Sequence, residues 1–360
     1  MHSDSLLALE PFGTLPTGEP IERYTLGNAH GMRVRIATYG GTLTSVTAPD
    51  SGGHWQDVVL GHDTLDEYLD NRCYLGAVIG RCANRIARGR FELNGRQIPL
   101  AINNGPNALH GGNRGFDKVV WTVTRAQLTT QGPQLRIAYV SHAGEEGYPG
   151  TLRVSVVYTL THNNTLHAEF NATTDRDTIV NLTQHTYFNL HGHGDILGHV
   201  LQIHADRFTP VDDTLIPTGE VRSVEGTAFD FRQPIPVGMR IDDDDEQLRI
   251  AKGYDHNWII DKPPGMLAVQ AVLEDPQSGR VLEVASTEPG LQVYSGNFLD
   301  GTPAGKGGSA YSFRSGLALE PQHFPDSPNH PSFPSVVLDP GRIYRNTIEY
   351  RFSARPCIHC

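Results

Sequence analysis

The chain has 360 residues, a formal net charge of −11 and an apolar fraction of 38%. This length and apolar content allow a sizeable core and argue against global disorder. The acidic balance argues against a nucleic-acid partner, because binding to phosphates requires clustered Lys and Arg. No stretch approaches the roughly 18 apolar residues of a membrane span, and the N-terminus lacks the basic region of a signal peptide. We therefore expect a soluble, cytoplasmic protein without membrane or nucleic-acid partners.

The cysteines are Cys73, Cys82, Cys357 and Cys360, too few for a disulfide framework in a chain of this length. The last two stand in "CIHC", which has the appearance of half a zinc site. No second half with matching spacing occurs elsewhere, so a loose tail is the favoured interpretation and no metal site is predicted.

The first predicted elements are a short helix and a hairpin. In "HDTLDEYLD" (62–70), Thr64 with Glu67 three positions later forms the pattern of a capping box, which predicts a helix start. In "GRFELNGRQIPL" (89–100), the Asn-Gly pair between two alternating segments predicts a two-residue hairpin turn.

Alternating segments dominate the rest of the chain. In three segments every second residue is apolar, so that the apolar side chains share one face, which predicts half-buried strands. These segments are "LRVSVVYTL" (152–160), "TLHAEF" (165–170) and "TIEYRF" (347–352). The acidic segment "IDDDDEQLRI" (241–250) favours a solvated loop, because a calcium site would space its acids at alternate positions. No fixed-length repeat and no linker interrupts the pattern. The prediction is a large all-β antiparallel β-sandwich with a few short helices, forming one domain over residues 1–360.

Polar side chains interrupt this pattern at several points among glycines and aromatic residues. Asn84 and Arg85 follow the apolar "LGAVIG", where the chain is expected to leave the core, although a basic surface strand would have the same composition. His110 stands in "NALHGG" between a leucine and two glycines that would let a ligand approach the backbone, or it is an ordinary loop histidine.

Two further stretches favour a binding floor. If "NLTQHTYFNL" (181–190) is one strand, alternation places Thr183, His185, Tyr187 and Asn189 on a single face, which is unsuited to a core and suited to a ligand. Asp255 in "YDHNWII" is either a turn residue or part of a sugar site. In a sugar site, aromatic rings stack on the sugar and short carboxylates hold paired hydroxyls.

The chemistry indicated by these stretches is proton transfer. The sequence contains no nucleophile elbow, no phosphate loop and no dinucleotide fingerprint, which argues against redox chemistry. In "LALEPQHFPD" (317–326), Glu320 follows an apolar run, and Pro321 is interpreted as ending the pairing of that strand, which would leave the carboxylate at the rim of a sheet. Carboxylates and histidines in a polar, aromatic-lined cleft are suited to acid–base catalysis.

Six motifs in this order resemble the galactose mutarotase (aldose 1-epimerase) family: "GRCANRIARGRF", "LHGG", "NLTQHTYFNL", "YDHN", "LQVYSGNFLDG" and "LEPQHFPDSPNH". The resemblance covers most of the chain and implies a one-domain β-sandwich that needs no cofactor. It implies a monosaccharide substrate such as galactose or glucose, in a monomer or homodimer. The family's acid–base pair falls on Glu320 as base and His185 as acid. Its sugar-holding residues fall on Asn84, Arg85, His110, Asp255 and Gln292.

This assignment requires Glu320 to be ionised and His185 to be protonated at the start, so mutual attraction is expected to raise the pKa of the histidine. The sequence departs from the family pattern at Pro321, where Thr is common, and at His323 and Phe324, where Asn and Trp are often found.

Three alternatives remain open at this point. A hexose-6-phosphate 1-epimerase would need cations for the phosphate dianion. A non-catalytic sugar-binding module would be expected to lack the acid or the base. A glycoside hydrolase would need two carboxylates across the scissile bond, for which Glu320 and Asp255 are candidates.

Overall fold

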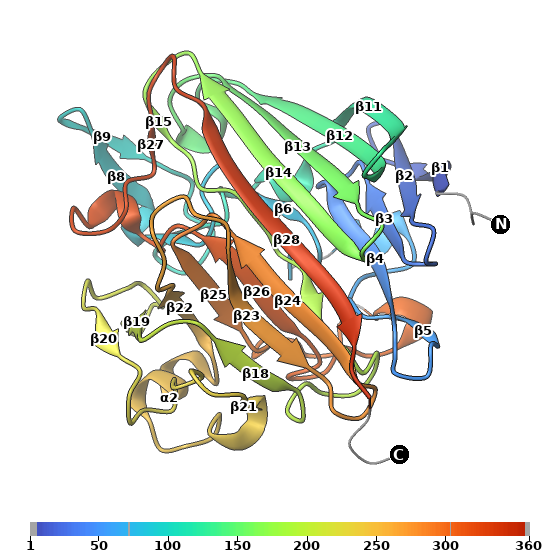
Figure 1. The fold of residues 1–360 in the computed structure, drawn as a ribbon. Helices are drawn as coiled ribbons and strands as arrows, with labels where there is room; N and C mark the ends of the chain where they lie inside the picture. Colours follow the sequence, from blue (N-terminus) through green and yellow to red (C-terminus); the bar gives the residue numbers. More distant parts are fainter. Residues whose placement is uncertain (1–5, 71–72, 303, 357–360) are drawn as a thin grey trace.

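The computed structural model describes residues 6–70, 73–302 and 304–356. Its largest element is a nine-stranded antiparallel sheet that crosses the front of Figure 1. In spatial order, its strands are β11 (Thr122–Thr129), β12 (Gly132–Ser141), β13 (Leu152–Leu160), β14 (Thr165–Thr174), β28 (Tyr344–Ala354), β24 (Arg280–Ser286), β23 (Ala268–Glu274), β18 (Val200–Ile203) and β21 (Ile235–Pro236).

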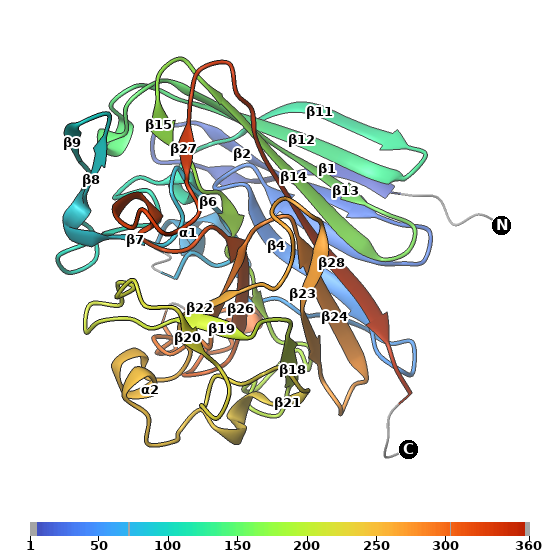
Figure 2. The same ribbon diagram turned by 60° about the vertical axis from the view of Figure 1, so that its left-hand side comes forward.

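Two smaller antiparallel sheets form the second layer behind this one (Figures 1 and 2). The five-stranded sheet contains β1 (Leu6–Thr14), β2 (Pro20–Gly27), β3 (Arg33–Ala37), β4 (Thr42–Pro49) and β5 (Trp55–Asp57). The six-stranded sheet contains β17 (Tyr187–Phe188), β26 (Leu317–Gln322), β25 (Gly290–Tyr294), β22 (Asp255–Ile259), β19 (Arg207–Thr209) and β20 (Arg222–Ser223).

Short pairs of strands, two α-helices and six three-residue 3-10 helices complete the described elements. The pairs are β6 (Val78–Ile79) with β16 (Thr183–Gln184), β7 (Arg85–Ile86) with β10 (Ala108–Leu109), β8 (Arg90–Leu93) with β9 (Arg96–Pro99), and β15 (Thr178–Ile179) with β27 (Val337–Leu338). The α-helices are α1 (Leu65–Leu69) and α2 (Glu246–Ala251). No helix in the described ranges has the length and apolar character that a membrane crossing would require.

The core lies between the two layers. A single cluster of buried side chains joins strands of the five-stranded sheet, the nine-stranded sheet and the six-stranded sheet, with Leu26, Val156 and Leu319 among its members. The predicted all-β sandwich is therefore confirmed. Alternation produces this result because each strand presents one apolar face to the layer opposite.

Several sequence predictions are confirmed at the level of single elements. The segments 152–160 and 165–170 lie in β13 and β14, and their alternate apolar side chains are buried. The Asn-Gly turn joins β8 to β9, with positive φ at both Asn94 and Gly95, as a type I′ hairpin requires. The Thr64 hydroxyl accepts the N–H of Glu67, and the Glu67 carboxylate accepts the N–H of Thr64, so the capping box is present.

Two other expectations were wrong in detail, and a third lies outside the described residues. The stretch 181–190 is not one strand but two two-residue strands, β16 and β17, which pair with different partners. The acidic segment is not all loop: Asp245 caps α2, accepting the N–H groups of Gln247 and Leu248. Residues 357–360, which carry the "CIHC" motif, lie outside the described residues.

Pro321 does not end its strand. It stands in register opposite Leu291 within β26, and pairing continues to Gln322. On its other side, β26 pairs with β17 only at Leu317 and Ala318, so no strand of this sheet requires an N–H from residue 321 on that side. A proline is tolerated at such an edge position because it has no ladder hydrogen bond to lose there.

Candidate functional site

The centre of the six-stranded sheet positions one wall of the site. Gln292 of β25 stands opposite Asn257 of β22 on one side and Glu320 of β26 on the other. Because side chains alternate along a strand, Asp255 shares a face with Asn257. Asp255, Gln292 and Glu320 therefore project from the same face of three adjacent strands, and all three are buried.

A second wall comes from the short pair β7 and β10. Arg85 of β7 stands opposite Leu109 of β10, so that Asn84 and His110 also face each other. The N–H of Asn84 donates to Nδ1 of His110 over 3.1 Å, and the N–H of His110 donates to the carbonyl of Asn84 over 3.1 Å. The bond to Nδ1 leaves the proton of a neutral His110 ring on Nε2.

These walls enclose a cavity of about 290 Å³. Six of the seven residues predicted for the site line it, namely Asn84, Arg85, His110, His185, Asp255 and Glu320. The seventh, Gln292, is not among the lining residues: its side-chain amide lies behind Asp255 and donates to Oδ1 of that carboxylate over 2.7 Å. Gln292 is therefore placed to orient Asp255.

The carboxylate of Asp255 is held from two directions. Gln292 donates to its Oδ1, and Nη1 of Arg85 lies 3.5 Å from its Oδ2. Nε of Arg85 in turn donates to Oδ1 of Asn104 over 3.1 Å. The guanidinium thus spans two acceptors in the cavity wall, which a planar fork of donors does better than a single ammonium group.

The two residues predicted as an acid–base pair, His185 and Glu320, are buried in the wall of the cavity. Nε2 of His185 and Oε1 of Glu320 are 3.6 Å apart, and both side chains are at least 95% buried. Within the described chain, Nδ1 of His185 and Oε2 of Glu320 have no hydrogen-bond partner. Two buried polar atoms without partners, beside two titratable groups at close range, are typical of a site awaiting a polar ligand.

Burial governs the ionisation of this pair. It lowers the pKa of His185 to about 3 and raises the pKa of Glu320 well above its ordinary range, with the nearby Asp255 raising it further. The expectation that attraction to Glu320 would raise the pKa of His185 is therefore wrong. The loss of water around the imidazole outweighs an attraction that acts over more than hydrogen-bond distance.

Aromatic rings surround the histidines. The ring of Tyr187 is stacked on His185 at a centroid distance of 5.0 Å, and the ring of Tyr74 meets His110 edge-on at 4.6 Å. The hydroxyl of Tyr187 donates to the carbonyl of Cys73, which fixes the ring. These contacts limit the positions that the imidazole of His185 can adopt.

Tyr187, which alternation placed on the same face as His185, also lines the cavity, whereas seven lining residues were not predicted: Cys73, Tyr74, Asn104, Leu109, Leu215, Tyr294 and Phe298. Leu109, Tyr294 and Phe298 stand inside stretches that were singled out in the sequence, so the polar and aromatic composition of those stretches could have found them. Leu215 and Tyr74 carry no such signal. Both have positive φ, as do Asn84 and His110, and backbone strain of this kind concentrates at functional sites.

A metal ion is a chemical alternative for part of this cavity. His110, His185 and Glu320 each offer one ligand atom, and these atoms lie within 4.8 Å of one another. Two features oppose a metal. The hydrogen bond from Asn84 places the proton of neutral His110 on Nε2, and Nδ1 of His185 lacks the outer partner that usually orients a ligating imidazole.

The comparisons with known proteins agree with one another. The family model for aldose 1-epimerase matches residues 22–351. A galactose mutarotase of Bos taurus is 47% identical over 345 residues, which cover 95% of this chain and 97% of that protein. An aldose 1-epimerase of Escherichia coli is 40% identical, over 94% of this chain and 97% of that protein.

A solved structure of galactose 1-epimerase from Lactobacillus acidophilus superposes with a TM-score of 0.87 at 28% identity, over 98% of this chain and 99% of that one. These similarities establish that the chain belongs to the aldose 1-epimerase family.

Proposed function

We propose that the cavity binds an aldohexose such as galactose or glucose and interconverts its α and β anomers by opening and reclosing the ring. The single observation that supports this most strongly is the buried pair of Glu320 and His185, 3.6 Å apart, in a cavity of about 290 Å³. The reaction needs one group to take the proton of the C1 hydroxyl and another to protonate the ring oxygen. It needs no electron acceptor.

Each protein group has a defined task in this proposal. Glu320 removes the proton from the C1 hydroxyl, His185 protonates the ring oxygen, and the bond between C1 and the ring oxygen breaks. After rotation about the C1–C2 bond, the two groups reverse roles and the ring closes as the other anomer. Nε2–H of His110 and the guanidinium of Arg85 hold the ring, while Asp255, oriented by Gln292, accepts outer hydroxyl groups.

The ionisation of the empty cavity bears on the order of these steps. Burial favours a protonated Glu320 and a neutral His185, which is also the distribution of protons that ring opening would produce. The bound cyclic sugar must therefore stabilise the charged pair through its hydroxyl groups. The empty site is prepared for the open-chain aldehyde, so that ring closure begins without a prior proton shift.

The alternatives fit the site less well. Among the described residues, Arg85 is the one Lys or Arg side chain that lines the cavity, and it already holds Asp255 and Asn104, which disfavours a sugar phosphate dianion. A non-catalytic module would have no use for both members of the buried pair. A glycoside hydrolase would release the phenol from an aryl galactoside, and we expect no release.

The decisive experiment is Glu320→Gln, which keeps the shape of the side chain and removes its basicity. The rate of mutarotation of freshly dissolved α-galactose, followed by polarimetry, should fall by about 10²–10⁴-fold while KM changes little. Glu169→Gln, on the exposed surface of β14, is the matched control and should retain full activity. Near-wild-type turnover by Glu320→Gln would show that another group is the base.

A further inference from the structure

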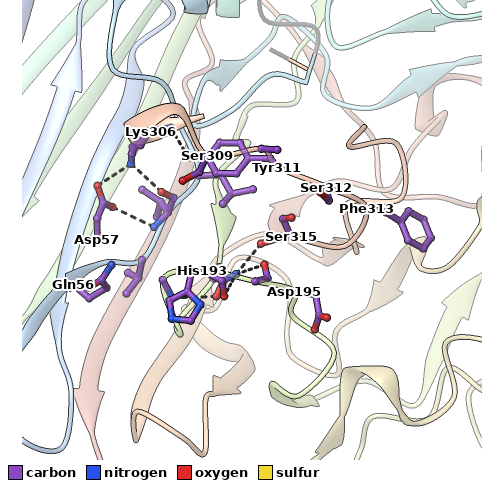
Figure 3. A pocket seen from close by; sticks show the side chains of 18 residues that line it. Gln56, Asp57, His193, Asp195, Lys306, Ser309, Tyr311, Ser312, Phe313 and Ser315 are labelled. Carbon is purple, nitrogen blue, oxygen red and sulfur yellow. Dashed lines mark hydrogen bonds and ion pairs between the residues drawn. The ribbon is translucent and has the colours of Figure 1, made fainter. Parts of the chain in front are cut away.

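A second cavity, of about 620 Å³, lies away from the acid–base pair. Three segments form it: the end of β5 and the residues after it, the loop that follows β17, and the loop that leads into β26. Figure 3 shows Lys306 and Asp57 on one side, Tyr311 and Ser309 above, Ser312 and Phe313 on the opposite side, and His193 and Asp195 below. The cavity shares no lining residue with the sugar cavity.

The lining offers unused hydrogen-bonding groups beside aromatic rings. No other described residue forms a hydrogen bond with the hydroxyl of Ser309, Ser312 or Ser315, or with the imidazole of His193. The ring of Phe313 is 47% exposed, and the guanidinium of Arg314 lies 4.4 Å from its centroid, which holds the ring in place. Hydroxyl and carboxylate groups beside fixed aromatic rings are the combination that binds sugars.

The charges exclude an anionic ligand. Nζ of Lys306 donates to Oδ2 of Asp57 over 2.8 Å and to the carbonyl of Val59 over 2.9 Å, so the cation is neutralised within the wall. Oδ1 of Asp195 accepts the N–H of Leu197, and its other oxygen faces no described cation. The formal charges of Asp57, Asp195 and Lys306 leave one net negative charge, which repels phosphate or a carboxylate ligand.

An apolar partition separates the two cavities. A cluster that includes Leu60, Tyr187 and Tyr294 fills the space between them. Leu60 lines the second cavity, whereas Tyr187 and Tyr294 line the sugar cavity. A ligand in the second cavity therefore cannot reach Glu320, and it would contact the opposite side of the wall on which the catalytic histidine is stacked.

We propose that this second cavity is an accessory binding site for a neutral saccharide of about two sugar units. Its polar and aromatic lining selects a polyhydroxylated ligand, and its net charge selects against anions. Its volume is about twice that of the cavity assigned to one hexose. Only this comparison of size rests on the proposed function. No catalytic step is assigned to the site, because no buried acid–base pair lines it.

The test measures binding by titration calorimetry with methyl β-lactoside, a disaccharide glycoside whose blocked anomeric carbon cannot undergo mutarotation. The wild-type protein should bind the probe with a millimolar Kd. Asp255→Ala, which removes a proposed acceptor of sugar hydroxyl groups from the first cavity, should bind it with a similar Kd. Ser312→Trp, which fills the second cavity, should weaken binding by about tenfold or more, and Asp195→Ala should weaken it by a similar factor. Inorganic phosphate should give no heat of binding.

Two controls keep the test independent of protein folding and of the proposed activity. Ser353→Trp, at an exposed position on β28, should bind the probe like the wild type. Ser312→Trp should keep the wild-type circular dichroism spectrum and thermal midpoint, which would show that the variant is folded. The proposal is overturned if the wild type does not bind the probe, if Asp255→Ala loses binding, or if Ser312→Trp and Asp195→Ala both bind like the wild type.

Discussion

Burial shifts the pKa values of Glu320 and His185, the proposed acid–base pair, in opposite directions. The carboxyl group of Glu320 stays protonated at pH values above its ordinary pKa, and the imidazole of His185 stays neutral at pH values below its ordinary pKa. Each group therefore resists the charge that the proposed mechanism requires of it at the start of ring opening. Burial destabilises the charged forms of both groups because it removes their hydration. The hydroxyl groups of a bound substrate can replace part of that hydration and so stabilise the charged forms.

The raised pKa of Glu320 predicts a stability cost that depends on pH. Below the ordinary pKa of 4.5, the folded and unfolded chains both hold this proton. Above it, the unfolded chain releases the proton while the folded chain keeps it, so the unfolding free energy falls as pH rises toward the folded pKa. In Glu320→Gln this loss is absent.

The thermal midpoint of Glu320→Gln, measured by circular dichroism, should therefore rise relative to wild type as the pH increases from 4.5 toward the raised pKa of Glu320. Glu169→Gln should show no such trend. A difference between Glu320→Gln and wild type that is constant across this range would contradict the assigned shift.

The geometry of Arg85 predicts that lysine cannot replace it. A single ammonium group cannot reach both Oδ2 of Asp255 and Oδ1 of Asn104, which Nη1 and Nε of the guanidinium approach separately. Loss of one charge-assisted hydrogen bond costs about 1.5–3 kcal/mol, so kcat/KM of Arg85→Lys should fall by about 10–150-fold. Arg33→Lys, at the exposed first position of β3, is the control. A loss of less than threefold would show that the fork is not needed.

Single residues differed in how far the sequence could predict their place. Glu320, His185, Asp255 and Arg85 stand in motifs, and all four line the cavity. Leu215 could not be found, because a leucine in an acidic loop carries no chemical signal and reaches the cavity only through the fold. The direction of the pKa shift of His185 also could not be predicted from the sequence. It depends on how completely the ring loses water, which is a property of packing.

At the scale of elements, Arg81 joins the segment before the site to the loop that follows β12. All five of its N–H groups donate: Nε to the hydroxyl of Ser141, Nη2 to the carbonyls of Ser141 and His142, and Nη1 to the carbonyls of Pro149 and Gly150. The side chain is 2% exposed. This buried cation is satisfied by carbonyl dipoles, not by a carboxylate.

Arg81→Lys should destabilise the protein, because an ammonium group has three donors and leaves at least two buried acceptors without a partner. Each such loss costs about 1–3 kcal/mol, so two losses predict a decrease of about 2–6 kcal/mol in the free energy of unfolding by urea. Arg90→Lys, at an exposed position of β8, should change it little. Equal stability of the two variants would contradict this role.

Elements were predictable where one local rule decided the outcome. Alternation identified β13 and β14, and the Asn-Gly pair identified the hairpin of β8 and β9. Residues 181–190 alternate equally well, yet they divide into β16 and β17 because β6 and β26 offer separate partners. Strand partners are set by the three-dimensional arrangement, which a local pattern does not contain.

At the scale of the whole molecule, buried histidines predict sensitivity to acid. Burial lowers the pKa of His185 and His256 to about 3 and of His199 to about 4, and it also lowers the pKa of His62 and His110. Below the ordinary pKa of 6.5, the unfolded chain binds protons that the folded chain does not, so stability falls with falling pH. Glu320, Asp117 and Asp326, whose pKa values are raised, offset part of this effect.

The free energy of unfolding by urea should fall as the pH decreases from 6.5 to 5. The decrease is about 1.4 kcal/mol per pH unit for each proton that the unfolded chain binds in excess of the folded chain. His256→Asn removes one of these protons, so it should reduce the slope of unfolding free energy against pH by about 1.4 kcal/mol per pH unit, whatever its effect on stability at pH 7. His30→Asn, at an exposed position, should leave the slope unchanged. A slope that His256→Asn does not alter would contradict the prediction.

The position of β28 has a consequence for how the protein is made. Residues 344–354 form the centre of the nine-stranded sheet, between β14 and β24, although they come last among the strands. During synthesis, the backbone groups of β14 and β24 that pair with β28 therefore remain unpaired until translation has passed residue 354. Such edges are sites of aggregation. Chaperones that cover nascent strands should consequently matter more to the yield of this protein than to its stability once folded.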